Sequence, residues 1–72
     1  MKLSAVFEKV DEGYIGFIEE LPGANAQEPT LEKTRAALVE AVELVLEGNR
    51  LLVEEAIEGR NVIREPLVLE RE

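Results

Sequence analysis

The sequence predicts an α+β fold in which a small antiparallel sheet packs on one long helix, in the order β-β-β-α-β. Three observations support it. Short runs rich in β-forming residues, separated by turn signals, fill residues 3–28. Apolar residues then recur at helical spacing over residues 31–58. An extended segment containing proline follows. Because 72 residues suffice for one small domain, we expect residues 1–72 to form a single domain.

Residues 3–10 and 14–21 are predicted to form the first two strands. Asp11-Glu12-Gly13 lies between them as a turn signal, so the pair should be an antiparallel hairpin. Side chains of a strand alternate between its two faces. In the first strand, one face is predicted to carry Leu3, Ala5 and Phe7, and the opposite face Ser4, Val6, Glu8 and Val10. In the second strand, one face is predicted to carry Ile15, Phe17 and Leu21, and the opposite face Tyr14, Gly16 and Ile18.

Residues 24–28 are predicted to form a brief third strand. Pro22-Gly23 supplies the turn before it. Pro29 follows it, and a proline forces the residue before it toward extended geometry. The helix should therefore start only after Pro29.

The helix is predicted over residues 31–58, with Thr30 as its N-cap and Glu32 in its first turn. Gly59 should end it in the left-handed conformation. A bend at Gly48 remains open, since glycine weakens a helix interior. The apolar stripe consists of Leu38, Ala41, Val42, Val45, Leu46, Leu52, Val53, Ala56 and Ile57.

The end of this helix should extend beyond the rest of the domain. A helix over residues 31–58 spans about 42 Å, whereas a compact chain of this length is only about 30 Å across. We therefore expect Leu52, Val53, Ala56 and Ile57 to need a cover, either the final segment or another subunit, and expect a homo-oligomer.

Residues 61–69 are predicted to be a last extended segment. Pro66 cannot donate a hydrogen bond to a neighbouring strand. The segment should therefore be an edge strand, or a strand that begins after Pro66.

The composition excludes several functions. The chain has no cysteine or histidine, which rules out disulfides, thiolate zinc sites and imidazole bases. With 16 acidic and 8 basic residues, the net charge of −8 disfavours direct binding of nucleic acid. No apolar run is long enough to span a membrane and no signal peptide is apparent. We therefore expect a soluble, cytoplasmic protein.

The residues offer little support for catalysis. Ser4 has no histidine to activate it. Glu19 and Glu20 are neighbours on a predicted strand, so their carboxylates should point to opposite faces. No cluster of acidic residues suggests a cation site. We predict no catalytic residue, no metal ligand and no cofactor, which leaves binding as the expected activity.

One stretch resembles the HicB antitoxin family. The resemblance covers most of the chain and consists of a Gly-aromatic strand start, an acidic-Leu-Pro-Gly turn, and a Thr-Leu-Glu helix start. The matching residues are Gly13-Tyr14, Glu20-Leu21-Pro22-Gly23, Gln27 and Thr30-Leu31-Glu32. Two details depart from the family pattern: Glu28-Pro29 replaces a glycine-containing turn, and Ala24 stands where cysteine or valine is common.

The resemblance implies a HicB-like domain with a partial RNase H-like fold that lacks nuclease residues. It also implies a HicA-like partner, a small basic mRNA-interferase toxin whose active site the antitoxin masks. Many members of that family also carry a C-terminal DNA-binding domain; since this sequence ends at Glu72, we expect no such domain and no direct binding of DNA. An acidic surface suits a basic partner, and the candidate partner-binding residues are Asp11, Glu12, Glu19, Glu20 and Glu28.

Two other interpretations stay open. The chain could be a homo-oligomeric regulatory or structural module without a toxin, as the extended helix end suggests. It could also be a metal-dependent hydrolase of RNase H type, which would require several carboxylates converging on one patch. Taken singly, each acidic residue is more simply explained as an ordinary solvated carboxylate.

Overall fold

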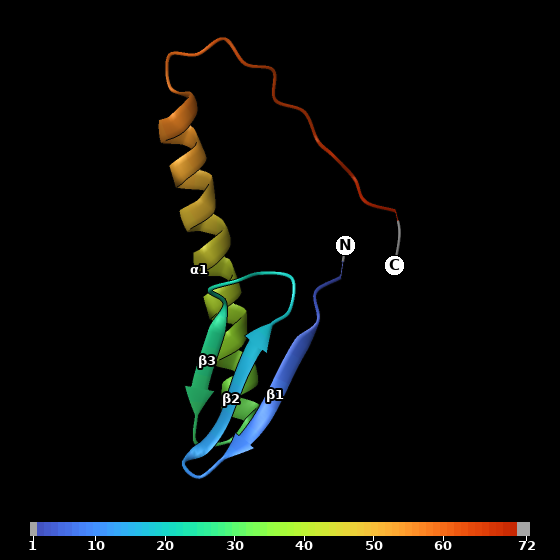
Figure 1. The fold of residues 1–72 in the computed structure, drawn as a ribbon, viewed down its shortest axis with the longest axis vertical. Helices are drawn as coiled ribbons and strands as arrows, with labels where there is room; N and C mark the ends of the chain where they lie inside the picture. Colours follow the sequence, from blue (N-terminus) through green and yellow to red (C-terminus); the bar gives the residue numbers. More distant parts are fainter. Residues whose placement is uncertain (1, 71–72) are drawn as a thin grey trace.

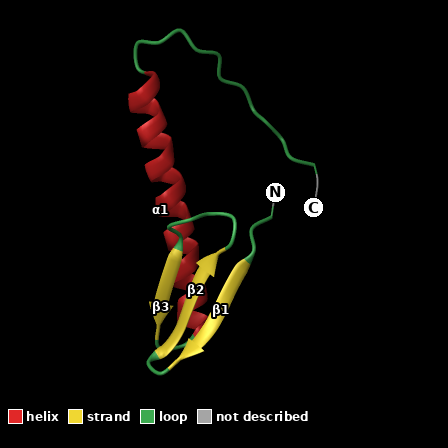
Figure 2. Cartoon of the chain, viewed as in Figure 1, coloured by secondary structure: helices red, strands yellow, loops and turns green. Residues whose placement is uncertain are grey.

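The computed structural model describes residues 2–70, which form three strands followed by one helix (Figures 1 and 2). The elements are β1 (Ala5–Val10), β2 (Gly13–Ile18), β3 (Asn25–Glu28) and α1 (Leu31–Ile57). The strands form one antiparallel sheet in the order β1-β2-β3, and α1 packs across one face of β2 and β3. This arrangement confirms the predicted α+β fold of a small antiparallel sheet on a long helix.

The β1–β2 hairpin closes at Gly13, which pairs with Val10. Gly13 has a φ of 142°, a conformation that side chains with a Cβ rarely adopt. A Cβ at this position would also collide with the carbonyl oxygen of Glu28 and the Cα of Pro29. The hairpin turn therefore lies directly against the backbone that leads into α1.

The second strand is shorter than predicted. It ends at Ile18, where the chain turns: the N–H of Leu21 donates to the carbonyl of Ile18 (3.3 Å), and the N–H of Ile18 donates to the carbonyl of Ala24 (3.1 Å). This turn brings Leu21 back against the core on the helix side. The prediction that Leu21 shares a face with Ile15 and Phe17 is wrong, because strand alternation stops at Ile18.

Thr30 caps α1 as predicted, with its Oγ1 accepting a hydrogen bond from the N–H of Lys33 (3.1 Å). One turn later Thr34 is fully buried, and its hydroxyl donates to the carbonyl of Thr30 (2.7 Å). The helix runs through Gly48 without interruption. Gly59 follows with a φ of 76°, as expected for a glycine after a helix end.

The core lies between the sheet and the first half of α1. Its buried apolar residues are Ile18, Ala24 and Leu38, and partly buried side chains surround them. The ring of Phe7 lies over Gly16, where an added Cβ would approach it to 2.9 Å. The partly buried residues are Phe7, Leu21, Ala26, Val42 and Val45.

Beyond Val45 the helix extends past the end of the sheet and no longer packs on it (Figure 1). Leu52 is 66% exposed, and the described chain measures 51 × 28 × 15 Å. We call residues 46–57 the helix overhang. Of the four apolar residues that we expected to need a cover, Leu52, Val53 and Ala56 are exposed there and Ile57 is partly buried.

The fourth strand predicted in residues 61–69 is not formed. Residues 61–70 have no regular secondary structure, and the chain turns back beside the helix overhang, where Arg64 Nη1 lies 2.8 Å from Glu54 Oε1. The overhang carries the end of α1 away from the sheet, and in this structure the segment that follows lies beside the overhang, joined to it by the Arg64–Glu54 pair, instead of along β1 (Figure 1). We call residues 61–70 the tail.

Candidate functional site

In the part of the chain that the structure describes, no helix covers one face of the sheet. Since Phe7, Ile18 and Ala26 pack toward α1, strand alternation directs their neighbours to the opposite face. Val6 pairs with Phe17 across β1 and β2, and Phe17 is 44% exposed. We call this the open face, formed by Val6, Glu8, Val10, Ile15, Phe17, Asn25 and Gln27.

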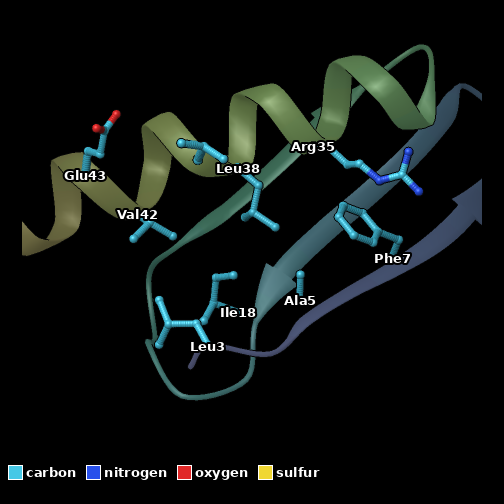
Figure 3. Close-up of a pocket in the computed structure, with 9 residues that line it drawn as sticks. Leu3, Ala5, Phe7, Ile18, Arg35, Leu38, Val42 and Glu43 are labelled. Carbon is cyan, nitrogen blue, oxygen red and sulfur yellow. The ribbon is translucent and has the colours of Figure 1, made fainter. Parts of the chain in front are cut away.

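A groove of about 500 Å³ runs between β1 and α1 (Figure 3). The sheet contributes Leu3, Ala5, Phe7 and Ile18, and the helix contributes Leu38, Val39 and Val42 together with the charged Arg35 and Glu43. The Arg35 guanidinium carbon lies 5.8 Å from the centre of the Phe7 ring, within range of a cation–π contact. We call this the β1 groove. It is almost entirely apolar and open to solvent.

The five acidic residues predicted to bind a partner fall into two groups. Asp11 and Glu12 form the β1–β2 turn, and Glu28 ends β3 beside it, opposite Tyr14. Glu19 and Glu20 lie in the turn after β2, at the other end of the sheet. The structure therefore brings three of these residues to one end and separates them from the other two.

Glu20 also has a structural contact. The N–H of Ser4 donates to Glu20 Oε1 (2.7 Å), and this hydrogen bond lowers the pKa of the Glu20 carboxyl. The neighbouring backbone is joined as well, because the N–H of Glu19 donates to the Ser4 carbonyl (2.9 Å). Glu20 thus helps to hold the start of β1 against the end of β2.

The predicted oligomer residues all lie on the helix overhang, where Leu52, Val53 and Ala56 are exposed and Ile57 is partly covered. Ion pairs lie on the same part of the helix. Arg50 donates two hydrogen bonds to Glu47 (2.6 and 3.1 Å), which lowers the pKa of the Glu47 carboxyl and raises that of Arg50.

Neither the open face nor the β1 groove was predicted from the sequence as a candidate binding site. One signal was available: β2 is apolar on both faces, with Ile15 and Phe17 on one and Ile18 on the other. Such a strand is typical of a sheet covered on both sides, yet a single helix can cover only one. The chain therefore already indicated an uncovered apolar surface.

Within residues 2–70, no three acidic side chains gather closely enough to hold a metal ion. In the same part of the chain, no helix is both long and apolar enough to cross a membrane.

Comparison with known proteins identifies the family. The UPF0150-like family matches residues 3–51, which include the whole sheet and most of α1. The UPF0150 protein ssl0738 of Synechocystis sp. (strain ATCC 27184 / PCC 6803 / Kazusa) is 38% identical over 63 residues, covering 79% of this chain and 88% of that protein. No solved structure matches. The chain belongs to the UPF0150-like family.

Proposed function

We propose that this chain is a HicB-type antitoxin module that binds a small basic RNA-cleaving toxin, of HicA-like type, in the cytoplasm. It acts by covering the toxin's RNA-binding surface and catalyses no reaction itself. The observation that carries the proposal is the open face, an uncovered, partly apolar sheet surface centred on Phe17, on a chain of net charge −8. The resemblance of the turn and helix-start motifs to HicB antitoxins supports the choice of partner.

The open face has the chemistry that such a partner requires. Phe17 and Val6 supply apolar contact area, and aromatic side chains are frequent among the residues that dominate binding energy. Asp11 and Glu12 at one end of the sheet, and Glu19 at the other, add negative charge around it. Complementary charge accelerates the encounter with a basic protein and competes with RNA for the same cationic surface.

The direct test is co-expression of this chain with the product of the neighbouring reading frame. We expect a stable complex and relief of that product's toxicity. A frame product that stays toxic and does not co-purify with the chain would contradict the proposal.

A pair of variants tests the surface. Phe17→Ala removes an exposed open-face ring and should weaken toxin binding by about tenfold or more. Leu44→Ala is the matched control, because Leu44 is 73% exposed on α1, away from the sheet. Circular dichroism should show both variants folded. Equal weakening by the two would exclude the open face as the toxin site.

A homo-oligomeric module without a toxin is the second candidate. The exposure of Leu52 and Val53 on the helix overhang favours it, because uncovered apolar residues of this kind often lie between subunits. The solution mass, together with the identity of the neighbouring frame, separates the two candidates. Self-association with no basic protein encoded next door would favour the second.

A further inference from the structure

The outer edge of β1 is an unfilled strand-pairing site. The carbonyl of Ser4 accepts from Glu19, so it points toward β2. Since backbone groups alternate along a strand, those of Ala5 and Phe7 point to the outer edge. Among the described residues no strand lies on that side. This free edge borders the β1 groove, whose floor includes the side chains of the same two residues.

The tail contains a short segment that matches this site. Residues 67–69, Leu-Val-Leu, lie outside regular secondary structure and are exposed, and Leu67 is 90% exposed. In a strand, Leu67 and Leu69 would share one face and point into the groove, while Val68 would join the open face. The backbone N–H groups of Leu67 and Leu69 would then point to β1, and the missing N–H of Pro66 would fall on the outer side.

Charge also fits the segment to the groove. Arg35 lies over the Phe7 ring and, among the described residues, forms no ion pair with a carboxylate. Glu65 and Glu70 flank the aliphatic run. Strand alternation puts Glu65 on the groove side with Leu67 and Leu69, and Glu70 on the opposite face. When residue 65 lies at the Phe7 end of the edge, its carboxylate therefore lies toward Arg35.

The chain's own tail does not occupy the groove in this structure. None of its described residues lines the groove, and Leu67 is 90% exposed. The Arg64–Glu54 ion pair joins the tail to the helix overhang, where Glu54 lies twelve residues, or about 18 Å along the axis, beyond Val42. In this arrangement the tail lies beside the overhang and leaves the groove at Phe7 and Arg35 open.

We propose that residues 67–69 of a second copy of this chain occupy the β1 groove, adding a strand to the outer edge of β1. Two copies that exchange their tails in this way form a closed dimer with twofold symmetry. The exchange does not depend on a toxin. It leaves most of the open face free, because the groove lies on the helix side of the sheet.

Cysteine cross-linking tests the exchange directly, since the chain has no cysteine of its own. We expect Val39→Cys and Leu67→Cys chains, mixed and oxidised, to form a disulfide-linked heterodimer, identified by a mass tag on one chain. Leu44→Cys replaces Val39→Cys as the control, because Leu44 lies on the same helix but does not line the groove. It should cross-link far less.

A second measurement uses tail variants that cannot disturb the core. The double variant Leu67→Lys and Leu69→Lys should raise the dimer dissociation constant by about tenfold or more. Ile63→Lys is the matched control: Ile63 is also 90% exposed in the tail but lies outside the inserted segment. It should change the constant by less than about twofold.

Three results would overturn the proposal. One is a chain that stays monomeric at every concentration tested. Another is a dimer that the double lysine variant leaves intact. The third is a Val39→Cys, Leu67→Cys double variant that closes its disulfide within a monomer, which would place the chain's own tail in the groove.

Discussion

Two glycines of this chain have opposite roles. Gly13 has a positive φ and its Cα lies against the backbone of Glu28 and Pro29, so no other residue fits there without strain. Gly48 lies inside α1 with nothing within 4 Å of where its Cβ would be. The first glycine is required by the fold, whereas the second only weakens a helix.

The same substitution should therefore have opposite effects at these positions. Gly13→Ala should lower the free energy of unfolding by about 1–3 kcal/mol through backbone strain, with the collision adding to that. Gly48→Ala should raise it by about 0.5–1 kcal/mol. Urea unfolding of both variants measures the two changes. Destabilisation by Gly48→Ala would show that this glycine has a role that the structure does not reveal.

The Glu20 carboxylate should contribute to stability in a pH-dependent way. Its hydrogen bond from Ser4 lowers its pKa in the folded state. The contribution is thus fully present above the unfolded pKa of about 4.3 and is lost as pH falls through the lower folded pKa. Glu20→Gln should reduce stability at neutral pH, and its difference from the unsubstituted chain should shrink in acid.

Thermal unfolding between neutral and strongly acidic pH checks this expectation. Glu19→Gln is the matched control, because it removes the same charge one position away while its backbone N–H still bonds Ser4. A Glu20→Gln difference that stays constant down to the lowest pH would contradict the role of the ionised carboxylate.

At the scale of the element, α1 has two halves with different environments. The first half packs on the sheet and holds Leu38, which is 3% exposed. The second half is the overhang, where Leu52 is 66% exposed. A regular apolar stripe thus runs along a helix of which only half has a sheet to pack on.

Replacing one leucine by alanine in each half of α1 should distinguish the two halves. Leu38→Ala should lower the free energy of unfolding by about 2–5 kcal/mol, because it opens a cavity in the core. Leu52→Ala should change it by no more than about 0.5 kcal/mol in dilute protein, where no second copy covers the overhang. Urea titration at low concentration tests this. Comparable losses would mean that the overhang is packed in the isolated chain.

Local patterns were sufficient to predict the strands, the cap and the helix, because alternation, Thr30 and the apolar stripe act over a few residues. The position of Leu21 could not be predicted in this way, since it depends on hydrogen bonds that turn the chain after Ile18. The absence of the fourth strand could not be predicted from local patterns either, because it depends on where the overhang places the tail relative to β1, a strand far away in the sequence.

At the scale of the whole molecule, the described chain is elongated and not compact. The radius of gyration of the described chain is 15.7 Å, against about 11 Å for a compact chain of this length. The excess comes from the overhang and the tail, both of which expose apolar residues. The candidate acidic residues could be listed from the sequence, but their separation to two ends of the sheet required the fold.

Charge should control how fast the proposed toxin complex forms. Asp11→Asn with Glu12→Gln removes two charges at the hairpin end and should slow association, more at low than at high salt. Stopped-flow measurement at two ionic strengths detects the change. Glu40→Gln with Glu55→Gln removes the same charge from α1 and should have a smaller effect. If the two pairs slow association equally, only the total charge matters.

The burial of Thr34 has a consequence for how this protein folds. Its hydroxyl is satisfied only when the first helical turn has formed, and its methyl group lies over Gly16 of the hairpin. Neither the hairpin nor the helix start is complete until the other is present. The two should therefore assemble in one cooperative transition, leaving few partly folded molecules in which the aliphatic surfaces of this small chain could aggregate.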